Sequence, residues 1–384
     1  MFFAEHHRNQ VYLWLGVSLE YMLFLTRWFG VTGTDAERNL TAEPAIIEEI
    51  VAKTLQMQVD AAAQQHRPLA RGTHAKGVCV HAEFEVLDVA AGRDHGLADR
   101  LGKGIFAKPA VYRAIVRFGN SDPHWNPDSK RDVRSLSFSI EPVPDGSNPT
   151  RRDYSMQSAT TLPLNDAAAF LAVIKVLTTS NPAKAVWSLS FRDRLRFVRS
   201  VLLVQSQLRQ KILPYQQLRY WSNVPFRHGP TDVVKYCATP NPDNLARALR
   251  KDHPNALQEE MVRHLNEDAR MSSFDFGLQF LDPARMTYWG KCRDASFWIE
   301  NASIEWNERQ TPFHTVGRLT LLPKSQLMEE ASEAVYFDVT GNSTPDSAPL
   351  GSINRARWPS EVASRKARMR PRTTHDAGAP TQLF

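Results

Sequence analysis

Three residues near the start of the chain have side chains suited to acid–base chemistry on an anionic ligand. His74 opens an alternating segment, Arg71 precedes it by three residues, and Arg117 lies in a second apolar segment, Val116-Arg117-Phe118. An imidazole can accept a proton from a bound substrate and return it to a leaving oxygen, which accelerates a reaction roughly 10²–10⁴-fold. The forked guanidinium of arginine pairs well with carboxylates. These residues predict a catalytic pocket for an anionic ligand. The alternative is a buried histidine whose hydrogen bonds are all made within the protein, beside two arginines that form structural or surface pairs.

The hydrophobic pattern predicts the elements that would position these side chains. Helical spacing covers Pro44 to Ala63, and Asn165 is expected to cap a helix over 166–177. Amphipathic patterns predict further helices within 183–212 and 243–268, and 142–153 reads as a loop. Alternating apolar residues predict strands at 78–86, 114–118, 135–140, 274–281, 297–304 and 316–322. Because strands flank a helical insertion without a βαβ rhythm, the predicted fold is α+β, built around an antiparallel sheet or β-barrel.

Composition limits the class of protein. The chain has 384 residues, 42% of them hydrophobic and 23% charged, which is typical of a globular protein with one large or two average domains. Its three cysteines, Cys79, Cys237 and Cys292, have no metal-binding spacing, so we expect a reducing compartment, the cytoplasm. The net charge of +6 is spread out except for a basic cluster at 365–372. We interpret that cluster as a solvated tail and expect no nucleic-acid partner.

The first forty residues differ from the rest of the chain. Residues 11–28 are rich in apolar side chains, but Glu20 and Arg27 interrupt them and leave too short a stretch to cross a bilayer. We predict an N-terminal extension at 1–40 that contains a partly apolar helix packed on the body of the protein. Contact of residues 11–28 with a membrane surface is the less favoured alternative.

Further motifs accompany His74 and the two arginines in a fixed order. Arg71-x-x-His74-Ala75-Lys76-Gly77 precedes Glu83-Phe84-Glu85-Val86, Val116-Arg117-Phe118 and Arg131-Asp132-Val133-Arg134, and later stretches follow at 220–229, 311–319 and 349–357. Together these motifs resemble the haem catalase family, and within it the short bacterial catalase-like haem-binding proteins. The resemblance covers roughly residues 43–368.

The resemblance implies a fold, a cofactor and a set of roles. The fold would be a catalase-like antiparallel β-barrel with surrounding helices, occupying a haem-binding domain at 41–368 and followed by a basic, disordered tail at 369–384. The cofactor would be haem b, with His74 on its distal face and with Arg71, Arg117 and Arg357 as cofactor-binding residues. The partner would be a small-molecule peroxide or an organic substrate. A homo-oligomer is compatible with the family, although this chain is shorter than the catalases that assemble through long arms.

The distal side departs from the family pattern. The serine that follows Arg-Phe in catalases is Gly119 here. The expected distal asparagine is missing from Ser155-Met156-Gln157-Ser158-Ala159-Thr160, where Gln157 or Ser158 could hydrogen-bond a peroxide. The resemblance therefore assigns catalytic positions to His74 and Ser158.

The proximal side departs further. Catalases ligate iron with a tyrosinate four residues after an arginine, and here the matching residue after Arg357 is Glu361. With Pro359 as the first turn, a helix would put Arg357, Glu361, Arg365 and Arg368 on one face. Glu361 would then either pair with its arginines or act as the metal ligand, a hard anionic oxygen donor to ferric iron. Tyr336, a water or an iron without a protein ligand are the other options.

Two functions follow from this pattern. The first is a catalase-like haem-binding protein with weak peroxidase or peroxide-dependent activity, in which the missing tyrosinate makes efficient catalase activity doubtful. The second is a haem-free or non-catalytic binding module on the same barrel, whose cationic pocket takes an anionic small molecule. Whether the protein is an enzyme, an oxidoreductase of the haem peroxidase or catalase type, depends on which is correct.

Overall fold

The computed structural model describes residues 15, 19, 29–31, 37–40, 42–141, 151–208, 211–250, 253–327 and 329–369. The predicted helix within 11–28 and the predicted tail from 369 onward lie almost wholly outside the described residues. So does most of the predicted loop at 142–153, although its last two residues begin a strand, β6.

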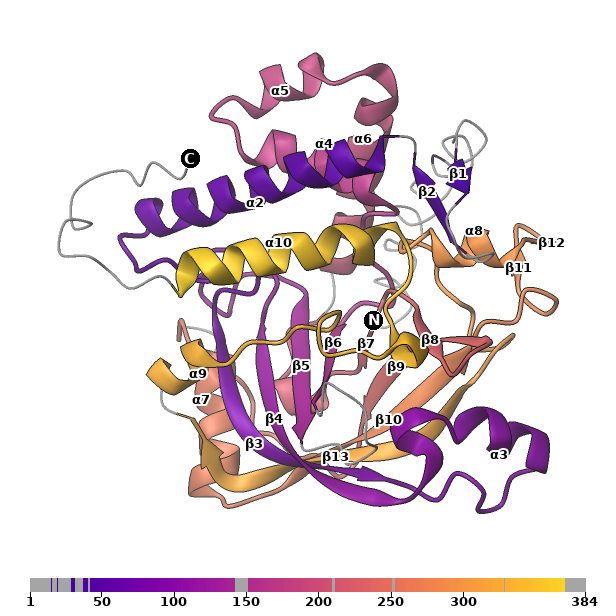
Figure 1. The fold of residues 1–384 in the computed structure, drawn as a ribbon. Coiled ribbons are helices and arrows are strands. Elements are labelled where there is room, and N and C mark those ends of the chain that lie inside the picture. The colour runs from indigo at the N-terminus through magenta and orange to yellow at the C-terminus, as the bar shows by residue number, and fades with distance from the viewer. Residues whose placement is uncertain are drawn as a thin grey trace.

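An antiparallel β-barrel forms the centre of the molecule (Figure 1). Strand order around it is β10-β13-β3-β4-β5-β6-β7-β9, and β9 also pairs with β10, which closes the sheet on itself. A short strand, β8, pairs with the outer edge of β9. The barrel strands are β3 (Gly77–Val86), β4 (Ala110–Asn120), β5 (Arg134–Glu141), β6 (Arg152–Gln157), β7 (Tyr220–Trp221), β9 (Asp232–Pro240), β10 (Ser272–Phe280) and β13 (Phe313–Gln326), with β8 at Phe226–His228. Both the predicted fold class and the antiparallel barrel are confirmed.

Aromatic side chains fill the barrel interior. Residues of β3 alternate between buried and exposed from Val80 to Val86, because successive side chains in a strand point to opposite faces. Phe84 packs against Phe138 with ring centroids 5.4 Å apart, and Phe138 stacks on Tyr154 at 4.7 Å. Phe276 meets Phe84 edge-on at 5.4 Å. This part of the barrel is therefore a packed core.

A layer of helices covers one end of the barrel. Figure 1 shows α2 and α10 lying side by side across that end, and α3 at the opposite end. The apolar face of α4 packs with Ile50 of α2 and Ala356 of α10 in a separate cluster. The helices are α2 (Glu43–Gln64), α3 (His95–Leu101), α4 (Ala167–Leu177), α5 (Pro182–Ser188), α6 (Phe191–Leu208), α7 (Ala256–Val262), α8 (Ala295–Ile299), α9 (Glu329–Ala334) and α10 (Ser352–Arg368).

Four local predictions were wrong. The predicted strand at 297–304 is instead helix α8 followed by a loop. Asp294 caps the helix by accepting the Phe297 N–H at 2.8 Å. Because the apolar residues here are buried on all sides, their spacing shows no period that distinguishes a helix from a strand. The predicted helix from 243 begins only at Ala256. In the first part of the predicted helix, the side chain of Asn244 forms hydrogen bonds with the backbone N–H and C=O of Ser273. These bonds compete with helix formation.

The other two concern helix starts. Asp166, not Asn165, caps α4, because its carboxylate accepts the Ala169 N–H at 2.8 Å. Helix α10 begins at Ser352, so Pro359 lies inside it and not in its first turn. The spacing of Arg357 and Glu361 on one face is unaffected.

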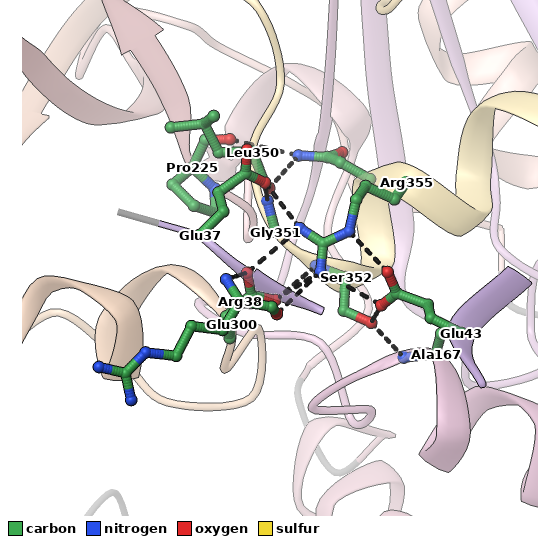
Figure 2. A network of polar contacts seen from close by, with 11 residues as sticks. Glu37, Arg38, Glu43, Ala167, Pro225, Glu300, Leu350, Gly351, Ser352 and Arg355 are labelled. Atoms are coloured by element: carbon green, nitrogen blue, oxygen red, sulfur yellow. Dashed lines mark hydrogen bonds and ion pairs between the residues drawn. The ribbon is translucent and has the colours of Figure 1, made fainter. Parts of the chain in front are cut away.

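A buried ionic network fastens α10 in place (Figure 2). Arg355 donates to three carboxylates: Glu43 of α2 at 2.8 Å, Glu37 at 2.7 Å and Glu300 at the end of α8 at 2.9 Å. Burial disfavours the charged guanidinium, but the hydrogen bonds to Glu43 and Glu300 outweigh it and raise the pKa of Arg355. Arg355 thus joins α10, α2 and α8 to Glu37, the residue before β2 (Arg38–Leu40), a strand that pairs with β1 (Phe29–Val31).

Backbone and hydroxyl groups complete the network. Ser352 donates its N–H to Glu300 at 2.9 Å and its hydroxyl to Glu43 at 2.7 Å, while its Oγ accepts the Ala167 N–H of α4 at 3.0 Å. The Arg38 N–H donates to Glu300 at 2.8 Å. The start of α10 is therefore tied to four other segments. Among the described residues, no helix is long and apolar enough to cross a membrane.

The network predicts an unequal effect of two arginine substitutions. Arg355→Met should lower the free energy of unfolding by about 3–5 kcal/mol, because it leaves buried carboxylates without a counter-ion. Arg38→Met removes only the exposed pair with Asp294, whose side chains are 46% and 56% accessible, and should change it by less than about 1 kcal/mol. Urea unfolding at neutral pH measures both, and equal losses would contradict the role given to Arg355.

Candidate active site

His74 lies in the loop that leads into β3, held in an uncommon backbone conformation. Its φ angle is 56°, a left-handed value that few residues other than glycine adopt. The backbone N–H groups of His74 and Ala75 donate to Ser121 and Asp122, each at 3.3 Å, which extends the β3–β4 pairing past the strand ends. Such strained positions persist where the surroundings fix them, and they cluster at functional sites.

The ring of His74 has a defined tautomer. Its Nδ1 lies 2.6 Å from the backbone oxygen of Asn120, and a carbonyl can only accept, so Nδ1 carries the proton. Nε2 therefore keeps its lone pair for another donor. A backbone carbonyl thus takes the place expected for a serine hydroxyl, one residue after Gly119.

The environment of His74 keeps the imidazole neutral. Burial lowers its pKa to about 4, and the positive charges of Arg117, Arg357 and Arg71 lower it too, against the opposing bond to Asn120. The residue nevertheless retains some accessible surface. A neutral imidazole with a free Nε2 can act as a general base above about pH 4.

Two glycines make room for Arg117. Gly77 of β3 pairs with Gly119 of β4. A Cβ at Gly77 would lie 2.7 Å from the Arg117 guanidinium carbon, and one at Gly119 would lie 2.9 Å from a guanidinium nitrogen. A side chain at position 77 or 119 would therefore crowd both Arg117 and the backbone of the neighbouring strand in this arrangement.

Three arginines converge on one carboxylate. Arg71 bonds to Glu333 of α9 at 2.9 Å, and the guanidinium groups of Arg368 and Arg117 lie 3.8 and 4.0 Å from it. Arg117 also donates to the Ala75 oxygen at 3.0 Å, but its buried Nε has no partner in the described part of the chain. The arginine cluster, defined as Arg71, Arg117 and Arg368, carries three positive charges against one negative charge.

Arg368 is, with Glu333, one of two residues of this region that sequence reasoning missed. The basic composition of 365–372 predicts a solvated side chain at this position, yet the Arg368 side chain is only 9% accessible. Burial and the nearby charge of Arg71 lower its pKa to about 10. Its position three turns after Arg357 on one face of α10 was the available signal.

Helix α10 brings its polar face to the same region. Arg357 and Glu361 form an ion pair, as one of the two sequence interpretations predicted. Burial raises the pKa of Glu361 and the charge of Asp338 adds to this, while Arg357 opposes both. The Gly72 N–H donates to Ser364 Oγ at 3.1 Å. Because Gly72 precedes His74 by two residues in the chain, this bond holds α10 against the loop that carries His74.

The other candidates lie apart from His74. Ser158 is buried, and its Oγ accepts the Arg134 N–H at 2.9 Å. Arg134 in turn donates from its guanidinium to the Asn120 side chain at 2.6 Å, next to the Asn120 carbonyl that His74 contacts. Tyr336 is held between Arg151 and Arg365, whose guanidinium carbons lie 4.9 and 4.5 Å from its ring centroid. The structure thus brings together His74, Arg71, Arg117 and Arg357.

The donor set can be tested against haem. Two uncompensated positive charges and the orphaned Arg117 Nε fit the two carboxylates of a dianionic ring. On α10 the fit depends on Glu361, because the last tyrosine of the chain is Tyr336. A carboxylate is a hard oxygen donor that ferric iron accepts, provided Arg357 releases it. The residues present therefore fit the carboxylate end of haem, and Glu361 would be an oxygen donor to its iron.

The depressed pKa of His74 predicts how stability depends on pH. Because the folded-state pKa of about 4 lies below the unfolded value near 6.5, the unfolded chain binds the proton first, and stability is lost as the pH falls through this range. Between pH 7 and 4.5, wild type should lose on the order of 2 kcal/mol more than His74→Gln. Denaturant titrations at both values measure the difference. Parallel pH profiles for the two proteins would contradict a buried neutral His74.

Similarity to known structures lies in the fold. No protein-family model matches the chain, and no curated protein matches its sequence. Among solved structures, a fungal catalase matches with a TM-score of 0.58 and 15% identity over 81% of this chain, and catalase A from Saccharomyces cerevisiae with 0.55 and 15% over 80%. The chain spans only 61% and 62% of those two proteins. A bacterial catalase matches with a TM-score of 0.52 and 14% identity, over 92% of this chain and 71% of its own length. The chain therefore has a catalase-like fold.

Proposed function

We propose that the protein binds haem b between α10 and the end of the barrel that carries His74, and that it reacts with peroxides far more slowly than an efficient catalase. The observation that carries the proposal is the charge of the arginine cluster. One buried and two partly buried guanidinium groups face one carboxylate, which leaves a surplus of two positive charges. Burying unpaired charge is costly, so the cluster favours a ligand with two carboxylates.

His74 would supply the acid–base chemistry. Its neutral ring has one nitrogen fixed by Asn120 and the other free to accept a peroxide proton. The same ring can return that proton to the departing oxygen. Haem, when bound, supplies the redox-active iron, and the arginine cluster holds its carboxylates.

The α10 side explains why we expect slow turnover. A tyrosinate donates electron density to iron, and a nearby arginine keeps the phenol ionised. Here the corresponding Glu361 is engaged by Arg357 and lacks an aromatic ring to fix its orientation. We propose Glu361 as the axial oxygen donor, weaker than a tyrosinate.

Hemin titration tests the role of the arginine cluster. Wild type should bind one equivalent and shift the Soret band of free hemin. Arg117→Met should weaken binding ten- to a hundredfold, because a charged hydrogen bond to a carboxylate is worth about 1.5–3 kcal/mol. Arg113→Met is the matched control: Arg113 lies on the same strand with its side chain exposed, and its substitution should leave affinity unchanged. A protein that stays colourless with excess hemin would contradict haem binding.

Substitutions of the axial and distal residues test the chemistry. Glu361→Tyr should convert the spectrum of the hemin complex to that of a tyrosinate-ligated ferric haem and increase the rate of peroxide consumption. His74→Ala should retain the spectrum of bound haem and lower that rate about 10²–10⁴-fold. An unchanged spectrum in Glu361→Tyr would remove residue 361 from the iron, and full activity in His74→Ala would remove the imidazole from the mechanism.

A second candidate, a haem-free module for another anionic molecule, is favoured by the Arg357–Glu361 pair, which needs no metal to satisfy it. Iron-free protoporphyrin IX separates the two. Equal affinity for the porphyrin with and without iron, unaffected by Glu361→Ala, would support the second candidate. A preference for hemin that Glu361→Ala abolishes would support the first.

A further inference from the structure

The carboxylate of Glu333 lies among the guanidinium groups of the arginine cluster. Its two oxygens face different members: Oε2 lies 2.9 Å from Arg71 and 3.8 Å from Arg368, and Oε1 lies 4.0 Å from Arg117. In each case a guanidinium nitrogen is the partner, as it would be for a bound anion. Only the Arg71 contact has hydrogen-bond length, so Glu333 satisfies the other two incompletely.

The cluster is under electrostatic stress even with Glu333 present. Burial lowers the pKa of Arg117 to about 10, and repulsion by Arg71 adds to it. Arg368 shows the same effect from burial and Arg71. A fourth arginine, Arg365, also repels Arg368 but is itself paired with Asp338 at 3.3 Å. The arginine cluster could therefore be balanced by more negative charge than the single carboxylate of Glu333 supplies.

Helix α9 holds Glu333 in position through its backbone. Arg71 donates to the backbone oxygens of Ser332 and Val335 at 3.2 and 2.6 Å, and Arg368 donates to the backbone oxygen of Glu333. Beneath the helix, the Cys79 thiol donates to the Ser332 oxygen at 3.7 Å. These bonds do not involve the Glu333 side chain, so α9 can stay docked when the carboxylate moves.

A pocket lies on the other side of Glu333. It has a volume of about 390 Å³ and is lined chiefly by polar side chains, including Asn126, Gln258 and Gln326, together with Ser332 and Glu333 of α9. The Glu333 side chain is 31% accessible, in contrast to 4% for Arg117. The carboxylate therefore borders both the arginine cluster and a solvated space large enough to receive it.

We propose that Glu333 is an exchangeable counter-ion: it neutralises the arginine cluster while the site is empty, and a ligand's carboxylate displaces it into the adjoining pocket. This deepens the proposed function in one respect, since it takes the ligand to be dianionic. No covalent bond changes in the exchange. Glu333 then sets the affinity of the site by competing with the ligand, and it keeps the arginines from repelling one another before the ligand arrives.

Glu333→Gln tests the competition, because it removes the charge and keeps the size. With protoporphyrin IX or hemin as the probe, and tryptophan fluorescence as the readout, the variant should bind at least tenfold more tightly than wild type. Glu333→Asp, which keeps the charge on a shorter side chain, should fall between them. Glu83→Gln on the exposed face of β3 is the control for net charge and should match wild type. Equal or weaker binding by Glu333→Gln would overturn the proposal.

A second readout does not depend on the porphyrin. Without ligand, Glu333→Gln should melt at a lower temperature than wild type, because the three arginines of the cluster lose their counter-ion, and added sulfate should restore part of the loss. Glu83→Gln should show neither effect. If no variant binds hemin or porphyrin, the proposed function fails, while this melting experiment still decides the role of Glu333. Equal melting temperatures for wild type and Glu333→Gln at low sulfate would refute that role.

Discussion

The ion pairs of Arg355 are the interaction on which the rest of the site depends. Helix α10 contributes Arg357, Glu361 and Arg368 to the region around His74, yet it is not part of the barrel, so something must set its position against the barrel end. Arg355 does this by joining the start of α10 to Glu43 of α2 and Glu300 of α8 (Figure 2). Because these carboxylates are buried, the pairing is strongly directional, and a shift of α10 along its axis would break several bonds at once.

The arginine cluster is charged, whereas the neighbouring imidazole of His74 is neutral. The arginine cluster collects more positive charge than the protein balances, and His74 next to it stays neutral because of burial and those same charges. The two features reinforce each other: cations that suit a ligand's carboxylates also prevent the imidazole from taking a proton before a substrate supplies one. Gly77 and Gly119 make this possible, since their lack of side chains lets Arg117 lie against the backbone between the strands.

The barrel and its motif residues could be predicted from sequence because both depend on local pattern. Alternation along β3 located a strand that pairs with β4, and the spacing of Arg71 and His74 on one short loop fixed their proximity. The predictions that failed concern residues whose surroundings depend on contacts between distant segments. Arg368 looked like part of a solvated tail because its burial arises from α9 and Arg71, and Glu333 had no signal at all. The strand predicted at 297–304 became α8 because a capping Asp294, and not the apolar run, decides where that helix begins.

Closure of the barrel has a consequence for the order in which the molecule is built. Strand β3 pairs on one side with β4, which follows it closely, and on the other with β13, which ends at Gln326. A chain emerging from the ribosome must therefore wait for its C-terminal third before the wall behind His74 is complete, and such non-local pairing is slow. Helix α10 comes later still. Because α10 carries Arg368, the arginine cluster is complete only after this helix has been synthesised, so a ligand that all three arginines hold cannot be bound until the barrel has closed and α10 has packed across its end.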